Sequence, residues 1–177
     1  MRFNLETLKP VKMKWFPLFF LLLFLVSCSH SYYIVRHAEK QSAGPNMNSD
    51  VALTVPGEQR AEDLMNELKH KKIGYVYSTQ TVRTILTATP TADYFGVEIK
   101  IYGPRPDSSF ISQLKLLKKN TLVVGHSNTV DDIVNMLCSS MQVPSDLKDN
   151  EYDNLFVVRK KGNRYKFSRK KFGAPSE

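Results

Sequence analysis

The stretch "SYYIVRHAEK", Ser31–Lys40, begins as a buried strand and ends in charged residues. The run from Tyr33 to Val35 is typical of a strand that is covered on both faces. Arg36 and His37 follow it directly. In an open α/β sheet, ligands bind in the crevice beyond the carboxyl ends of the strands, so this placement indicates a binding site. The alternative is a strand that surfaces here and leaves its polar residues in water.

The rest of the chain alternates between helical and extended patterns. The predicted strands cover about residues 32–36, 73–77, 97–102 and 121–126, and the predicted helices about 56–68, 81–94, 108–118 and 128–141. Pro90 is expected to kink or interrupt the second helix. The tail reads as two strands joined around Gly162-Asn163. This order predicts an α/β fold, a single three-layer domain with a mostly parallel sheet flanked by helices.

The composition fits one globular domain and carries an excess of positive charge. The chain has 177 residues, of which 42% are hydrophobic and 24% charged, with a formal net charge of +8. Much of the excess lies before residue 15 and in the C-terminal run 159–171. For this run we expect an alternating hairpin whose exposed lysines discourage aggregation. A nucleic-acid surface and a surface resting on anionic lipid are the alternatives, and we expect no nucleic-acid partner.

The N-terminal segment is expected to lie outside the folded domain. Basic residues precede the apolar block "LFFLLLFLV", which is too short for a membrane span of about 20 residues. The sequence Leu25-Val26-Ser27-Cys28 resembles the bacterial lipobox, in which the cysteine is lipidated. We therefore predict a signal peptide at 1–27, a domain at 28–177, and an extracytoplasmic protein anchored to the membrane through Cys28. An ordinary signal peptide with an incidental cysteine is the alternative, and either Met1 or Met13 fits as the start.

Three residues of interest fall at or just after the carboxyl ends of predicted strands. His37 follows the first strand, Arg83 comes just after the second, and His126 follows "LVVG". Each histidine alone could be an ordinary core residue, but together with Arg36 they predict one shared site. The four histidines of the chain have no spacing typical of metal ligands, so no metal and no cofactor are expected.

Four segments carry a resemblance to a known family. "VRHAEK" resembles the Arg-His-Gly signature of the histidine phosphatase superfamily, also called phosphoglycerate mutase-like. "DVALTVPGEQRA", "STQTVRTILTA" and "VVGHSNTV" are similar to its next three motifs, in the same order. The resemblance runs from about Tyr32 to the final strands. It implies that His37 is the nucleophile that accepts a phosphoryl group, and that Arg36, Arg83 and His126 bind the phosphate.

The chemistry of these residue types agrees with the implied roles. An imidazole nitrogen can attack phosphorus and later be displaced by water. Arginine binds phosphate through two parallel hydrogen bonds and stays charged at any relevant pH.

The chain departs from the family pattern at two positions. Ala38 stands where the signature has glycine, and we expect a small residue to be tolerated there. Ser127 follows His126, where the acid-phosphatase branch has its aspartate proton donor. A general acid is therefore sought between the second arginine and the second histidine. Asp107, in the loop after the third strand, is favoured for this role, and Glu98 is the alternative.

The sequence thus predicts a metal-independent phosphatase that hydrolyses a small phosphomonoester through a phosphohistidine intermediate. One alternative is a phosphoglycerate mutase-like phosphotransferase, which uses the same nucleophile. The other is a non-catalytic lipoprotein that binds a phosphorylated ligand. The sequence does not identify the substrate or the oligomeric state.

Overall fold

The structure is a computed structural model that describes residues 29–44 and 50–176. The predicted signal segment and Cys28 lie outside the described residues, so the domain boundary at residue 28 stays a prediction. Within the two described ranges, no helix has both the length and the apolar character needed to cross a bilayer.

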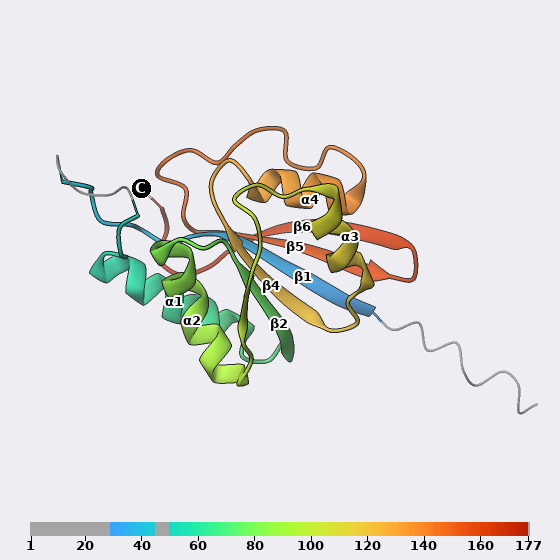
Figure 1. The fold of residues 1–177 in the computed structure, drawn as a ribbon, viewed down its shortest axis with the longest axis horizontal. Coiled ribbons are helices and arrows are strands. Elements are labelled where there is room, and N and C mark those ends of the chain that lie inside the picture. The colour runs from blue at the N-terminus through green and yellow to red at the C-terminus, as the bar shows by residue number, and fades with distance from the viewer. Residues whose placement is uncertain (1–28, 45–49, 177) are drawn as a thin grey trace, which may run out of the picture.

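A six-stranded mixed sheet forms the middle layer of the domain, and helices cover both of its faces (Figure 1). The strands are β1 (Ser29–Arg36), β2 (Ile73–Ser78), β3 (Ile99–Ile101), β4 (Asn120–Gly125), β5 (Asn154–Lys161) and β6 (Arg164–Lys171). Their order across the sheet is β3-β2-β4-β1-β5-β6. The first four strands are parallel, whereas the β5–β6 hairpin pairs antiparallel to β1. The predicted three-layer α/β fold is confirmed.

The helices divide between the two faces because alternate residues of each strand point to opposite sides. They are α1 (Val55–Leu68), α2 (Val82–Phe95), α3 (Ser108–Leu116) and α4 (Val130–Cys138). Tyr33 and Val35 of β1 pack into a core with α1 and α2, whereas Tyr32 and Ile34 pack into a core with α3 and α4. The continuous apolar run in β1 is therefore buried on both sides.

Two elements differ from the sequence-based expectation. α2 continues through Pro90 without a break. Proline removes the bond to the carbonyl of Leu86, and Leu86 lies on the solvent side of the helix, where water can replace that bond. α4 begins at Val130 rather than near Asn128. Thr129 is its N-cap, and the Thr129 hydroxyl accepts a hydrogen bond from the backbone N–H of His126 rather than from the first turn of the helix.

The crevice of the sheet opens between the carboxyl ends of β1 and β4. These strands are neighbours, but β1 leads to α1 on one face and β4 leads to α4 on the other. Ligand crevices form where adjacent strands diverge in this way. The backbone N–H of His37 donates to the carbonyl of Gly125 over 2.9 Å, which continues the β1–β4 ladder into the crevice. Two chain segments that are distant in sequence therefore deliver their histidines to one place.

Candidate active site

His37 and His126 lie together at this crevice. Their ring centroids are 5.6 Å apart, and the rings meet edge to face. The positive charges of Arg36 and Arg83 both act on His37, and the Arg83 guanidinium contacts the His126 ring directly. The structure therefore brings together four of the five residues predicted for the site.

The imidazole of His37 is held in one tautomer. Its Nδ1 lies 2.8 Å from the carbonyl oxygen of Ala38. A carbonyl oxygen can only accept, so Nδ1 carries the proton and Nε2 keeps its lone pair. Burial lowers the pKa of His37 to about 3, and the charges of Arg36 and Arg83 act in the same direction. His37 is therefore neutral at pH 7 and has an unprotonated nitrogen.

His126 is held through both ring nitrogens. Nη2 of Arg83 lies 3.4 Å from Nδ1, and the hydroxyl of Thr79 lies 2.9 Å from Nε2. A guanidinium can only donate, so Nδ1 accepts from Arg83 and Nε2–H donates to Thr79. Burial, followed by the charge of Arg83, lowers the pKa of His126 to about 4. His126 offers no free N–H in this arrangement, and donating to a phosphate requires Nδ1 to take up a proton.

Arg36 is buried and partly engaged by the backbone. Its Nη1 donates to the carbonyls of Lys148 and Asp149 over 2.8 and 3.0 Å. The guanidinium lies 4.2 Å from the ring centroid of Tyr152, and that ring is 6.2 Å from the ring of His37. Nε of Arg36 is buried and has no hydrogen-bond partner within the described residues. A buried orphan donor is costly, and an oxyanion bound in the crevice would satisfy it.

Arg83 lies at the start of α2 and is paired with a carboxylate. Its Nη1 contacts Oδ1 of Asp50 over 3.4 Å, and the same oxygen accepts from the backbone N–H of Val82 over 2.8 Å. Asp50, the first residue of its motif, is therefore joined to the amino end of α2. This pairing places a negative charge beside the Arg83 guanidinium.

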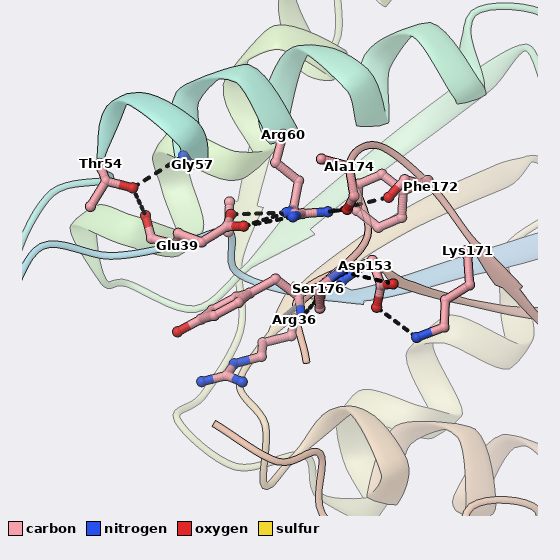
Figure 2. Close-up of polar contacts among 12 residues, drawn as sticks. Arg36, Glu39, Thr54, Gly57, Arg60, Asp153, Lys171, Phe172, Ala174 and Ser176 are labelled. Atoms are coloured by element: carbon pink, nitrogen blue, oxygen red, sulfur yellow. Dashed lines mark hydrogen bonds and ion pairs between the residues drawn. The ribbon is translucent and has the colours of Figure 1, made fainter. Parts of the chain in front are cut away.

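The loop after His37 is fixed by an ion pair with α1. Arg60 is buried, and its Nε and Nη2 donate to both carboxylate oxygens of Glu39 over 2.6–2.9 Å. Figure 2 shows the two groups facing each other, with the carbonyls of Phe172 and Ala174 accepting from the other edge of Arg60. Bidentate pairs of this kind fix geometry as well as adding energy. Glu39 thus holds the loop that follows His37 against α1.

Close packing explains two residues of the family-like motifs. A Cβ on Gly57 would lie 2.2 Å from the carbonyl oxygen of Glu39, so only glycine lets α1 start this close to the loop. The backbone N–H of Ala38 donates to Thr87 of α2 over 2.9 Å, and Ala38 is fully buried beside Leu53 and Ala61. The small residue expected at position 38 is therefore required by packing.

Asp107 does not lie with the other predicted site residues. It is the exposed N-cap of α3, and its carboxylate accepts from the backbone N–H of Phe110 over 2.7 Å. This contact accounts for the aspartate without a catalytic role. Glu98 is also exposed, just before β3. No described contact joins either carboxylate to His37 or His126, so a general-acid role for Asp107 or Glu98 stays a prediction.

A hollow of about 480 Å³ adjoins His126. It is lined by the turn after β2 and by the loop after β3, namely Thr79, Gln80, Thr81, Ile101, Tyr102, Gly103 and Pro104. None of its lining side chains carries a charge at pH 7, since His126 is neutral there. A second hollow of about 460 Å³ lies between the Glu39–Arg60 pair and Tyr152. The first hollow therefore leaves open space beside the two histidines.

The described residues do not assemble a metal site. Within 29–44 and 50–176, no group of three histidine, cysteine, aspartate or glutamate side chains is placed to hold a metal ion. Metal independence itself stays a prediction.

Part of the chain matches the sequence profile of a known protein family. Residues 32–103, which include Arg36, His37 and Arg83, match the sequence profile described as "Histidine phosphatase superfamily (branch 1)". The predicted resemblance to the histidine phosphatase superfamily is confirmed over these residues. A search of curated protein sequences found no match.

Solved structures share the fold over the whole domain. The protein histidine phosphatase SixA complexed with tungstate is 19% identical with a TM-score of 0.64, covering 80% of this chain and 96% of its own. Phosphoglycerate mutase from Bacillus anthracis str. Sterne is 13% identical with a TM-score of 0.57, covering 80% and 92%. Phosphoserine phosphatase from Entamoeba histolytica, in complex with 3-phosphoglyceric acid, is 13% identical with a TM-score of 0.55, covering 82% and 98%. At sequence identities this low, the comparisons show only that the fold is shared.

Three neighbours of the histidines were not predicted from the sequence. Thr79 and Asp50 lie inside or beside the family-like motifs, so their position could have suggested a role. Tyr152 comes from the loop before β5, where no motif points to it. Its contact with Arg36 depends on a loop that returns across the sheet.

Proposed function

We propose that this protein is a histidine-type phosphatase that transfers a phosphoryl group to His37 and then to water. The observation that carries the proposal is the state of His37. It is neutral, its Nδ1 is fixed by Ala38, and it sits beside His126 within reach of the charges of Arg36 and Arg83. A neutral imidazole next to fixed positive charge suits attack on a phosphate dianion.

Two displacements make up the proposed reaction. Nε2 of His37 forms a bond to phosphorus while the bond to the leaving oxygen breaks, and that oxygen takes up a proton. Water then attacks the phosphohistidine, the P–N bond breaks, the water gives up a proton, and phosphate leaves. Arg36 and Arg83 neutralise the equatorial oxygens in both steps. When the oxyanion lies against His126, Nδ1 takes up a proton and donates to it, since negative charge favours the protonated ring.

The test uses the full chain in detergent with p-nitrophenyl phosphate. His37→Asn should abolish turnover while leaving the fold intact, because asparagine keeps a polar amide but has no nucleophilic nitrogen. His70→Asn, at an exposed site far from the crevice, is the matched control and should keep full activity. Turnover that survives in His37→Asn would remove His37 from its role. Phosphorus NMR on a phosphoglycerate would show a mutase instead, if phosphate moves between hydroxyls without release.

A second substrate class is favoured by how the carboxylates are used. Glu39 is paired with Arg60, Asp50 contacts Arg83, and Asp107 caps α3. A carboxylic acid that protonates an alkoxide leaving group contributes about 10²–10⁴ in rate. Substrates that leave without this help, such as a phosphorylated imidazole with its P–N bond, suit a site of this kind better. The structural neighbour named as a protein histidine phosphatase supports this second candidate.

The leaving group separates the two candidates. Rates are compared for p-nitrophenyl phosphate, phosphoimidazole and glycerol 2-phosphate, in the parent chain and in Asp107→Asn. Asparagine also caps helices, so this variant keeps α3 and loses only the acid. If Asp107 is the general acid, hydrolysis of glycerol 2-phosphate falls by about 10²–10⁴ and the other two rates stay unchanged. If the rates are equal in both proteins and glycerol 2-phosphate is a poor substrate, the phosphoramidate assignment is supported.

We also propose that the protein is an extracytoplasmic lipoprotein anchored through Cys28. The support is the lipobox-like segment and the start of β1 at Ser29, one residue beyond the cysteine, so that the fold begins where the anchor would end. Each buried CH₂ of an acyl chain adds about 0.8 kcal/mol. Mass spectrometry of the N-terminal peptide should show diacylglycerol on Cys28, and Cys28→Ser should move the protein out of the membrane fraction. An unmodified Cys28 in a membrane-bound chain would contradict the proposal.

A further inference from the structure

The end of the domain opposite the crevice gathers basic side chains. The parallel strands begin there, the helices end there, and the β5–β6 hairpin turns there. We call this surface the basic end, and it consists of Lys69, Lys71, Lys72, Lys115, Lys118, Lys119, Arg159, Lys160, Lys161, Arg164 and Lys166. Only Glu67, Asp93 and Glu98 contribute carboxylates at this end within the described residues. Most of the other described carboxylates lie toward the catalytic side.

Contacts join these residues into one continuous surface. Nζ of Lys160 donates to the carbonyl of Lys115 over 2.6 Å, which connects the hairpin to the end of α3. The amide of Asn120 donates to the carbonyl of Lys71, which connects the end of α1 to the start of β4. Partial burial, and then the charges of Lys118 and Lys115, lower the pKa of Lys160. The positive charges are therefore close enough to repel one another.

Two exposed apolar side chains lie at or just after the ends of helices that end on this side of the domain. Leu116, the last residue of α3, is 76% exposed, and Met141, after the end of α4, is 72% exposed. α3 and α4 cover the same face of the sheet. They also contact each other, since Nζ of Lys115 in α3 donates to the carbonyl of Met136 in α4 over 3.2 Å. Apolar side chains surrounded by lysine are typical of surfaces that enter the headgroup region of a bilayer.

The chain enters the domain at this same end. Ser29, the first residue of β1, pairs with Lys161, the last residue of β5. Figure 1 shows the start of β1 and the turn of the β5–β6 hairpin together at one end of the molecule, with the C-terminus at the other. Cys28 and the apolar block of the N-terminal segment therefore precede the basic end directly in sequence.

We propose that the basic end docks on an anionic phospholipid bilayer, with Leu116 and Met141 in the headgroup region, and that this holds the catalytic crevice facing away from the membrane. Three observations carry the proposal: the one-sided charge, the exposed apolar side chains on the same side, and the entry of the chain beside it. Basic residues near an anionic surface contribute about 1 kcal/mol each. The attraction acts over about 10 Å at 0.1 M salt, so it falls as the salt concentration rises.

The test measures docking separately from anchoring. The full chain is reconstituted into phosphatidylcholine vesicles with or without about 30% phosphatidylglycerol, because the attraction requires anionic lipid. Amide hydrogen exchange is then followed by mass spectrometry. The inference rests on the proposed anchor at Cys28, which would hold the chain in both vesicles and is checked separately by mass spectrometry of the N-terminal peptide. A difference in exchange between the vesicles then reports the docked surface. Exchange at residues 116–119, 139–143 and 161–164 should slow in the anionic vesicles, and the difference should vanish at high salt.

Charge-reversal variants provide the matched comparison. Lys118→Glu, Lys161→Glu and Arg164→Glu together change exposed residues of the basic end, and the protection should be lost. Lys40→Glu, Arg105→Glu and Lys148→Glu change the net charge equally on the other parts of the surface and should keep it. Equal exchange in both kinds of vesicle, or equal behaviour of the two variants, would overturn the proposal. So would protection of the same segments by a single-stranded oligonucleotide without vesicles, which would assign the surface to nucleic acid.

Discussion

Acid pH should destabilise the protein through its two crevice histidines. Burial lowers the pKa of His37 to about 3 and of His126 to about 4, from a value near 6.5 for an unfolded histidine. Below pH 6.5 the unfolded chain therefore binds protons at these positions and the folded chain does not. Stability is lost as the pH falls from 6.5, and the loss from each histidine ends near its folded pKa.

The size of the effect follows from these pKa values. Between pH 8 and pH 5, protonation of each histidine in the unfolded chain lowers the free energy of unfolding by about 2 kcal/mol. His37 is 3% exposed and should show the full effect, whereas the half-buried His126 should show less because solvent screens its charge. Together they should remove about 3–4 kcal/mol of unfolding free energy. That is a large share of the stability of a typical domain.

The measurement is urea unfolding of the full chain at pH 8 and pH 5. A variant with His37→Asn and His126→Asn has no titrating side chain at either position, while the remaining titrating residues are unchanged. The parent should therefore lose about 3–4 kcal/mol more than this variant between the two pH values, and each single variant should show an intermediate loss. Parallel losses in the parent and the double variant would refute the assignment of both rings as buried and neutral.

Two further substitutions test the packing around Arg36 and the loop that follows His37. Gly57→Ala should destabilise the fold by about 1–3 kcal/mol, because its Cβ would lie 2.2 Å from the Glu39 backbone. Gly103→Ala, whose Cβ would have its nearest neighbour at 3.6 Å, should leave the melting temperature unchanged, and equal shifts would contradict the packing argument. Tyr152→Leu removes the ring beside Arg36 and should weaken inorganic phosphate binding by about 0.5–2 kcal/mol in calorimetry. Tyr152→Phe keeps the ring and should bind normally, so an equal loss in both variants would count against the ring contact.

Much of the fold could be predicted because burial leaves a clear pattern in these elements. The unbroken apolar run of β1 indicated a strand covered on both faces, and the structure covers it with α1 and α2 on one side and α3 and α4 on the other. The meeting of His37 and His126 was predictable because parallel strands collect their carboxyl ends along one edge. The expected interruption at Pro90 is absent, because the cost of the lost hydrogen bond depends on exposure, and the sequence does not show which side of α2 faces solvent.

Other parts of the site depend on geometry that no local pattern contains. Glu39 and Arg60 are opposite charges 21 residues apart, and their pairing requires α1 to start against the loop that follows His37. Tyr152 reaches Arg36 only because the loop before β5 crosses the mouth of the crevice. Asp107 was chosen for its place after the third strand, but the same place makes it a helix cap, and sequence position alone does not separate these roles.

The C-terminal segment has a practical consequence for handling the protein. The carbonyls of Phe172 and Ala174 accept from Arg60, and the hydroxyl of Ser176 accepts from the backbone N–H groups of Tyr152 and Asp153 (Figure 2). A purification tag fused directly at this terminus, or trimming of the last few residues, would disturb the hollow between the Glu39–Arg60 pair and Tyr152. An assay on material altered in this way would not report on the intact hollow.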